Sequence, residues 1–225
     1  MQTLLHEDMR WCLIRLPKIV LKLLKDEPKK VMLAGGFIRA CIANEKTPDI
    51  DLFAQSKDSA ELYARRLAEK YRLVSTDNAF TIIGKKPTVQ FIHKWIYAEP
   101  ADIIRSFDFT IARAVIWFDG DNWQSLCDDR YYADLAARRL VYCSPKRIEE
   151  AGGSLLRILK FYQRGYRIPL DSLAAVVARF VAGVDIENVE TEKDWAYILT
   201  ELLREVDPQI DPTNMSHLPT GNERG

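Results

Sequence analysis

The sequence has little of what cysteine- or histidine-based metal sites require. Its cysteines show no Cys-x-x-Cys spacing, and its three histidines lie far apart along the chain. These spacings argue against a zinc motif and favour buried thiols in a reducing compartment. The residues concerned are Cys12, Cys41, Cys127 and Cys143, together with His6, His93 and His217.

A charge excess is also absent. The 32 Lys and Arg residues balance 32 Asp and Glu residues, so the net charge predicts no partner, and a nucleic-acid-binding surface would have to be a local patch. No apolar run reaches the length of a membrane span. Charged residues near the start, such as Glu7, Asp8 and Arg10, do not fit a secretory signal. We therefore expect a cytoplasmic protein with no membrane partner.

What the sequence does contain is an ordinary globular composition. Hydrophobic residues make up 48% of the 225 positions and charged residues 28%. A chain of this length can bury a substantial core, as one large domain or two small ones.

The stretch from Val31 to Phe53 carries the strongest local pattern. An apolar run leads into Gly35-Gly36, a short amphipathic segment follows, and Asp49-Ile50-Asp51 opens a second apolar run. This order predicts strand, glycine turn, helix and strand. Glycines let backbone amides approach an anionic group closely, at the positive end of the helix that follows.

The two aspartates of this stretch form a candidate metal site. Residues two apart in a strand share a face, so Asp49 and Asp51 are expected to project together while Ile50 and Leu52 point into the core. Carboxylate pairs of this kind suit Mg²⁺, which binds one or two carboxylates plus substrate phosphates. A phosphate-binding turn beside such a pair is what nucleotidyl transfer requires, although either element alone is most often structural.

These motifs resemble a known family. Gly35-Gly36-Phe-Ile-Arg39 followed by Asp49-Ile-Asp51 is similar to the signature of the DNA polymerase β-like nucleotidyltransferases. The closest resemblance is to the head domain of bacterial-type (class II) CCA-adding enzymes and poly(A) polymerases. Partial matches to later family motifs follow in order: Phe107 to Ile111 (ribose-binding), Asp134-Leu135 with Arg138-Arg139-Leu140 (basic stretch), and Glu150 to Tyr166 (arginine-rich helix).

The resemblance implies an α+β fold in which a nucleotidyltransferase head, with a mixed or antiparallel sheet flanked by helices, precedes a short all-helical neck-like region. The expected divisions are an N-terminal packing helix in 1–30, the head in 31–144, the neck-like region in 145–207 and a flexible tail in 208–225.

The resemblance also implies a reaction and its residues. The protein would transfer NMP from an NTP, with ATP as first choice, to a hydroxyl acceptor and release pyrophosphate. The acceptor would be an RNA 3′ end or, as the alternative, a protein or small molecule. Mg²⁺ would be held by Asp49 and Asp51, which are the expected catalytic residues. The expected nucleotide-binding residues are Gly35, Gly36 and Arg39 at the triphosphate, Asp108 at the ribose, and Arg157 and Lys160 near the nucleotide.

Several positions depart from the family pattern. Gln90 stands where a third metal-binding carboxylate is expected, and Ser106-Phe107 replace an arginine pair. Glu150 to Ser154 lacks the Asp and Arg with which CCA-adding enzymes read the base. These departures leave a second hypothesis open, a nucleotide-binding regulatory module with the same fold and no turnover. Two roles are also left open for Asp108, at the ribose or as a turn cap, and for Arg138-Arg139, at a phosphate or at a helix C-terminus.

Periodicity and turn residues predict further elements along the chain. Helices are expected over Leu13–Lys25, Lys57–Tyr71, Ala98–Phe107, Tyr131–Arg139, Ser172–Val181 and Thr191–Val206. Hairpins are expected from Phe80–Ile83 with Val89–Ile92, and around the turn Asp119-Gly120-Asp121-Asn122.

Overall fold

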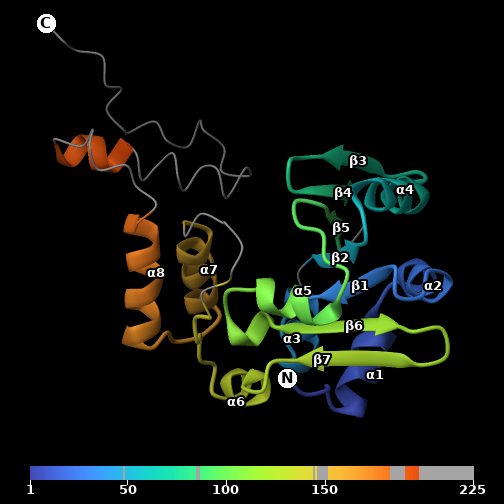
Figure 1. Cartoon of the computed structure of the whole chain (residues 1–225), viewed down its shortest axis with the longest axis horizontal. Helices are drawn as coiled ribbons and strands as arrows, with labels where there is room; N and C mark the ends of the chain where they lie inside the picture. The colour runs from blue at the N-terminus through green and yellow to red at the C-terminus, as the bar shows by residue number, and fades with distance from the viewer. Residues whose placement is uncertain (48, 85–86, 144, 146–151, 183–190, 198–225) are drawn as a thin grey trace, which may run out of the picture.

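The computed structural model describes residues 1–47, 49–84, 87–143, 145, 152–182 and 191–197 (Figure 1). Among these residues, no helix has both the length and the apolar character that a membrane crossing needs.

A seven-stranded sheet forms the centre of the described chain, in the order β3-β4-β5-β2-β1-β6-β7. β2 (Ile50–Ala54) runs parallel to β5 (Val89–Ile92) and antiparallel to β1 (Val31–Ala34). The other neighbours pair antiparallel; their bounds are β3 Arg72–Ser75, β4 Ala79–Ile83, β6 Ala114–Phe118 and β7 Trp123–Cys127. This mixed, mostly antiparallel sheet with flanking helices confirms the expected α+β fold.

The two faces of the sheet carry cores of different size. Ile50 and Leu52 of β2 are fully buried in the larger core. Four helices contribute to this core: α1 (His6–Arg15), α2 (Lys18–Asp26), α3 (Gly36–Ile42) and α4 (Lys57–Ala68). Phe53 points to the other face and joins a smaller cluster with Met32 of β1 and Ile103 of helix α5 (Pro100–Ser106). Because alternate strand residues point to opposite faces, Asp51 lies on the same side as Phe53. The smaller cluster therefore marks the face on which the predicted metal ligand lies.

The N-terminal region contains two helices where the periodicity predicts one over Leu13–Lys25. Helix α1 ends at Arg15, and α2 (Lys18–Asp26) begins directly after Pro17. Proline cannot donate the backbone hydrogen bond that a helix interior needs, and it drives the preceding residue to an extended conformation. Leu16 is extended accordingly (φ −69°, ψ 141°). The single packing helix predicted in residues 1–30 is wrong in this respect, since α1 (His6–Arg15) and α2 are separate elements.

Helix α4 (Lys57–Ala68) and the strands after it close the far side of the sheet. The Ser56 hydroxyl accepts the backbone N–H of Ser59 at 3.1 Å and so caps the helix. The helix ends before the predicted Tyr71, and Arg72 opens the edge strand β3, which the sequence patterns do not predict because it is short and half-exposed. The predicted hairpin is present as β4 and β5.

The second half of the sheet is completed by a tight hairpin. The Asp119 carboxylate accepts the backbone N–H groups of Asp121 and Asn122, both at 2.8 Å, in the turn between β6 and β7. Before it lie α5 and a 3₁₀ turn (Thr110–Ala112), and after it comes α6 (Tyr131–Ala136). Both predicted helices are present, although α6 stops three residues before Arg139.

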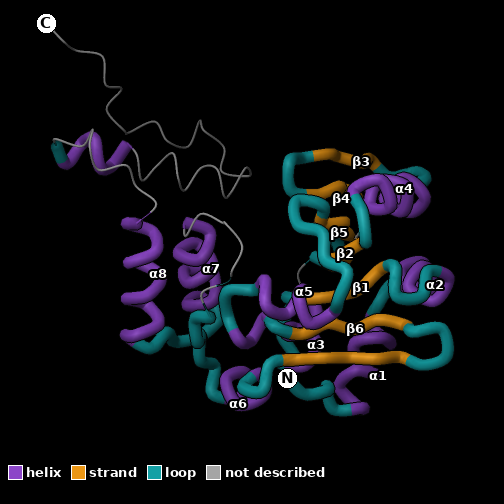
Figure 2. The backbone as a smooth tube through the Cα atoms, in the orientation of Figure 1, coloured by secondary structure: helices purple, strands orange, loops and turns teal. Residues whose placement is uncertain are grey.

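Helices α7 (Gly152–Gln163) and α8 (Leu170–Ala182) form a pair beside the sheet (Figure 2). Backbone hydrogen bonds tie their connection to the head, from Leu140 N–H to Arg167 O and from Arg167 N–H to Arg138 O, both at 2.8 Å. The division at residue 145 remains a prediction. The tail 208–225 and the second half of the helix expected over Thr191–Val206 lie outside the described residues, whereas 192–197 are helical.

Candidate functional site

The glycine turn lies where β1 meets helix α3 (Gly36–Ile42). Gly35 has φ +78°, and a Cβ added there would come within 3.0 Å of Cζ of Phe107. Its backbone N–H donates to Ala114 O at 3.0 Å, so the sheet uses this amide. Gly35 therefore has a conformational and steric role, and Gly36 is the member of the pair that lines the cleft described below.

The two aspartates lie at the start of β2. Asp49 is exposed just before the strand, and half-buried Asp51 lies within it, between Ala34 of β1 and Gln90 of β5. Burial raises the pKa of Asp51 from 3.8 to about 7, and the negative charge of Asp49 adds to this effect. The pair therefore repels itself in the absence of a cation. A divalent ion bound by both carboxylates would relieve this repulsion.

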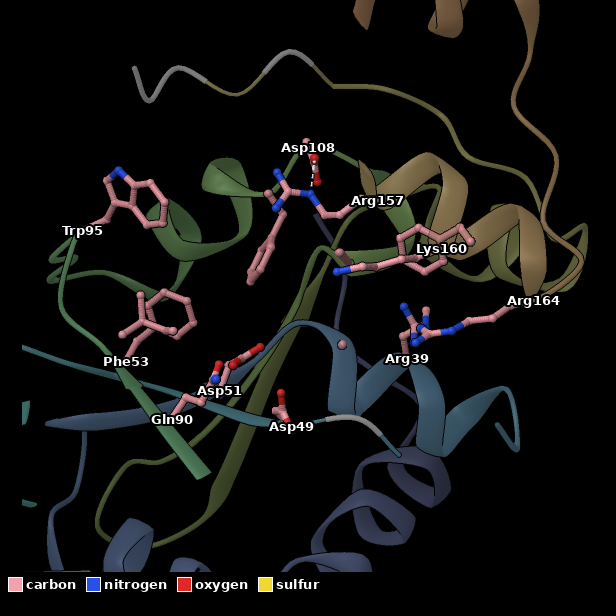
Figure 3. A pocket seen from close by; sticks show the side chains of 15 residues that line it. Arg39, Asp49, Asp51, Phe53, Gln90, Trp95, Asp108, Arg157, Lys160 and Arg164 are labelled. Atoms are coloured by element: carbon pink, nitrogen blue, oxygen red, sulfur yellow. Dashed lines mark hydrogen bonds and ion pairs between the residues drawn. The ribbon is translucent and has the colours of Figure 1, made fainter. Parts of the chain in front are cut away.

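A cleft of about 330 Å³ opens above the pair and joins the head to α7 (Figure 3). It brings together Gly36, Arg39, Asp49, Asp51, Asp108, Arg157 and Lys160, which are all the residues predicted for the site except Gly35. Residues more than 100 positions apart thus meet at one place. Further residues that line the cleft are Phe53, Gln90, Ile92, Trp95, Phe107, Ala112, Phe161 and Arg164.

Gln90 stands directly beside Asp51. The two residues are partners in the parallel register of β2 and β5, and both line the cleft. This is the place next to the pair where the family resemblance leads us to expect a third carboxylate. An amide offers an oxygen ligand without the negative charge. In the described part of the chain, no group of three or more Asp, Glu, His or Cys side chains is arranged to hold a metal ion.

One side of the cleft is positively charged. We call Arg39, Lys160 and Arg164 the cationic wall; Figure 3 shows all three to one side of Asp51. Lys160 and Arg164 are exposed on and just after α7, so they can reach an anion in the cleft. Three- and four-residue spacing in the sequence already groups Arg164 with Arg157 and Lys160, although Arg164 is not among the residues predicted for the site.

Arg39 has a more enclosed position than the other two cations. It is 2% exposed, its Cζ lies 4.7 Å from the centre of the Phe161 ring, and its Nη2 is 3.5 Å from Glu45 Oε2. Burial lowers the pKa of Arg39, and the Glu45 charge partly offsets this. Tyr166 donates its hydroxyl to Glu45 Oε1 at 2.8 Å. Arg39 therefore ties α3 to α7.

Asp108 anchors helix α7. Its carboxylate is 2% exposed and accepts hydrogen bonds from Arg157 Nε at 2.7 Å and from Ser154 Oγ at 2.9 Å. Asp108 and Arg157, predicted separately at the ribose and the nucleotide, are thus partners of each other. Among the described residues the carboxylate accepts no backbone N–H of a turn, and any contact with a ribose would have to compete with α7.

The opposite side of the cleft is apolar. We call Phe53, Trp95 and Phe107 the aromatic wall; the Phe53 and Phe107 rings meet edge to face at 6.1 Å. Figure 3 shows Trp95 and Phe53 across Asp51 from the cationic wall. The sequence analysis missed Trp95 because it follows β5 in an irregular segment with no local pattern.

Arg138 and Arg139 do not line the cleft. Arg139 binds the fully buried Asp134 through Nη2 at 2.7 Å and Nε at 2.9 Å. Arg138 donates from Nη1 to Arg164 O at 2.7 Å, in the connection to α8. Between the two roles that the sequence left open, this geometry favours the structural one.

The fold is similar to that of CCA-adding enzymes of known structure. A Thermotoga maritima CCA-adding enzyme complexed with tRNA matches with a TM-score of 0.57 and 18% identity, over 92% of this chain and 55% of that one. A CCA-adding enzyme in complex with ATP matches with 0.56 and 19%, over 93% and 52%, and an apo form with 0.58 and 19%, over 88% and 48%. The chain spans about half the length of these structures. At such identities the likeness shows the fold alone, and it confirms the resemblance found in the sequence.

A family model gives a closer assignment. The model described as Gabija anti-defense 2 family protein matches residues 5–138, which is more than half of the chain. The chain belongs to this family. None of the curated proteins matches it. The matched range contains the glycine turn, both aspartates and Asp108, and it ends before α7.

Proposed function

We propose that this protein is a Mg²⁺-dependent nucleotidyltransferase that moves NMP from an NTP to a hydroxyl acceptor and releases pyrophosphate. The observation that carries the proposal is the single cleft in which Asp49 and Asp51 face Lys160 and Arg164. Carboxylates for a metal and cations for phosphates, side by side in one cavity, match the two charged parts of a metal-bound triphosphate.

Asp49 and Asp51 would hold the metal, with the Gln90 amide as a weak additional ligand. The raised pKa of Asp51 supports this assignment, because burial and the neighbouring Asp49 charge both disfavour the ionised carboxylate and a bound cation would offset them. When bound, Mg²⁺ would supply charge neutralisation at the phosphates and make the acceptor hydroxyl more acidic.

The triphosphate is assigned to the side of Gly36, Lys160 and Arg164, with Arg39 behind them. Lys160 and Arg164 are exposed to the cleft and can form charge-assisted hydrogen bonds to phosphate oxygens. Asp108 and Arg157 would act mainly by fixing α7, and hence Lys160, above the aspartates. ATP is the first nucleotide to test.

Two kinds of acceptor are considered for the proposed transfer. An RNA 3′ end fits the resemblance to CCA-adding enzymes, and a protein or small-molecule hydroxyl is the alternative. The description of the family supports a role against Gabija defence. We propose that transfer by this cleft underlies that role, in a protein that acts in the cytoplasm.

The test uses α-labelled ATP, CTP, GTP and UTP with Mg²⁺, total cellular RNA and total cellular protein. Wild type should label an acceptor, and Asp49→Ala/Asp51→Ala should abolish the label. Asp77→Ala is the matched control, because Asp77 is an exposed carboxylate that does not line the cleft. In Gabija-protected cells, the double variant should lose anti-defence activity and Asp77→Ala should keep it. Label that persists in the double variant would contradict the proposal.

A second function, a nucleotide-binding module without turnover, is favoured by one observation. Gln90 occupies the register position beside Asp51 and brings no charge to a metal. In this case ATP should bind, and no pyrophosphate should be released from any NTP. Asp49→Ala/Asp51→Ala should then leave metal-independent ATP binding unchanged, and anti-defence activity should survive it.

A further inference from the structure

The aromatic wall faces the position from which an acceptor must arrive. In phosphoryl transfer the attacking and leaving oxygens lie roughly in line on opposite sides of the phosphorus. If the triphosphate tail lies along the cationic wall, pyrophosphate leaves toward Lys160 and Arg164. The acceptor hydroxyl then approaches from the side of Phe53 and Trp95 (Figure 3), to which Phe107 also belongs through its ring contact with Phe53. This step rests on the proposed function.

The side chains that line this side are aromatic or aliphatic, and such a lining suits a flat, uncharged ring. Phe53 and Phe107 form an edge-to-face pair, and the ring centre of Tyr97 lies 6.3 Å from that of Phe53. Ile92 completes the apolar lining. Trp95 is half-buried, so part of its surface remains accessible. Aromatic groups gain about 0.5–1.5 kcal/mol from edge-to-face or offset contacts beyond their burial.

The surroundings of the wall do not favour a polyanion. Trp95 and Phe107 of the wall belong to residues 94–107, and in that segment the cations Lys94 and Arg105 are balanced by Glu99 and Asp102. Arg105 also pairs with Asp102 at 3.1 Å. A nucleic-acid strand is bound through a continuous run of cations along its phosphates, and this segment has no net positive charge.

We propose that the aromatic wall is the acceptor subsite and that it takes the side chain of a protein tyrosine. The ring lies against Trp95, Phe53 and Phe107 and directs the hydroxyl toward Asp49 and Asp51. The phenolic oxygen forms a bond to the α-phosphorus of the NTP, and the bond from that phosphorus to the pyrophosphate oxygen breaks. Pyrophosphate leaves, the phenolic proton passes to solvent, and the product is a tyrosine–NMP phosphodiester.

The first experiment measures ring binding and needs no turnover. Saturation-transfer NMR is recorded with N-acetyl-tyrosinamide as the probe, using wild type, Trp95→Ala, Trp95→Phe and Trp11→Ala. Trp11 is an exposed tryptophan on α1 outside the cleft and serves as the matched control. We expect about fivefold or greater weakening in Trp95→Ala, near wild-type binding in Trp95→Phe and no change in Trp11→Ala. Absence of a signal in wild type overturns the subsite, and so does equal binding in Trp95→Ala that melts like wild type.

The second experiment measures transfer from ATP with Mg²⁺ to a pentapeptide, Gly-Gly-Tyr-Gly-Gly, at millimolar concentration. The Ser and Phe analogues and hexa-adenylate RNA are assayed in parallel by mass spectrometry. The expected result is AMP on the tyrosine peptide alone, reduced in Trp95→Ala with ATP binding unchanged. AMP on the RNA or serine peptide instead overturns the tyrosine assignment, as does ATP hydrolysis without any peptide product. Ring binding that depends on Trp95 in a protein that does not turn over ATP would sink the proposed transfer reaction while preserving the ring-binding subsite.

Discussion

Asp51 and Asp108 are two carboxylates that line one cleft, and their surroundings are opposite. Asp108 accepts hydrogen bonds from Arg157 and Ser154 and joins α7 to the head. The Asp51 carboxylate makes no hydrogen bond or ion pair with any described residue, and its pKa is raised to about 7. A buried carboxylate with partners stabilises a fold, whereas one without them costs stability and is kept where an external cation completes it. The comparison separates the residue proposed for chemistry from the residue that positions it.

The largest expected effect is on turnover. Asp51→Asn should reduce NMP transfer by about 10³-fold, because the amide removes the charge that holds the metal while keeping the shape of the side chain. Release of pyrophosphate from ATP in the presence of acceptor is the measurement. Asp108→Asn should lose far less activity, and an equal loss in the two variants would break the comparison.

The next effect is on stability and concerns Asp108. Asp108→Ala should lower the melting temperature by about 5 °C or more, because it leaves Arg157 and Ser154 without their buried acceptor. Differential scanning calorimetry measures this. Exposed Asp77→Ala provides the reference and should melt like wild type. A variant with unchanged melting but a raised KM for ATP would instead assign Asp108 to the ribose.

A smaller effect, of opposite sign, is expected for Asp51 as a function of pH. Its folded-state pKa of about 7 lies above the ordinary 3.8, so the folded chain binds this proton more tightly than the unfolded chain. The resulting stabilisation is complete below about pH 4 and is lost as pH rises through 7. In metal-free buffer, the melting temperature of Asp51→Asn should exceed that of wild type increasingly from pH 5 to pH 8. A constant difference across this range would show that Asp51 does not titrate there.

The smallest expected effect is on metal affinity, when a negative charge is added beside Asp51. Gln90→Glu should place a third carboxylate beside Asp51 and tighten Mg²⁺ binding by about tenfold, measured by calorimetric titration. It should also lower the melting temperature in metal-free buffer, because like charges then crowd the strand ends. Gln163→Glu, at an exposed position of α7 that does not line the cleft, is the control. Unchanged metal affinity in Gln90→Glu would show that this position does not reach the metal.

The sequence predicts the centre of this site better than its walls. The two-residue repeat of a strand predicts that Asp49 and Asp51 lie side by side. The conformational freedom of glycine predicts the turn at Gly35. Both are local properties of the chain. The pairing of Asp108 with Arg157 joins residues 49 positions apart, which no periodicity encodes. The place of Trp95 in the cleft could not be predicted either, because Trp95 lies in an irregular segment with no periodic pattern. Pro17 alone predicts the break between α1 and α2, whereas the continuous apolar face of the region predicts one helix.

The parallel register of β2 and β5 has an evolutionary consequence. It sets Gln90 against Asp51, and glutamine and glutamate codons differ by one base. The third acidic ligand expected from related enzymes is therefore one point mutation away, with no rearrangement of the backbone. If Asp49 and Asp51 hold a metal as proposed, this single substitution would turn a two-carboxylate centre into a three-carboxylate one.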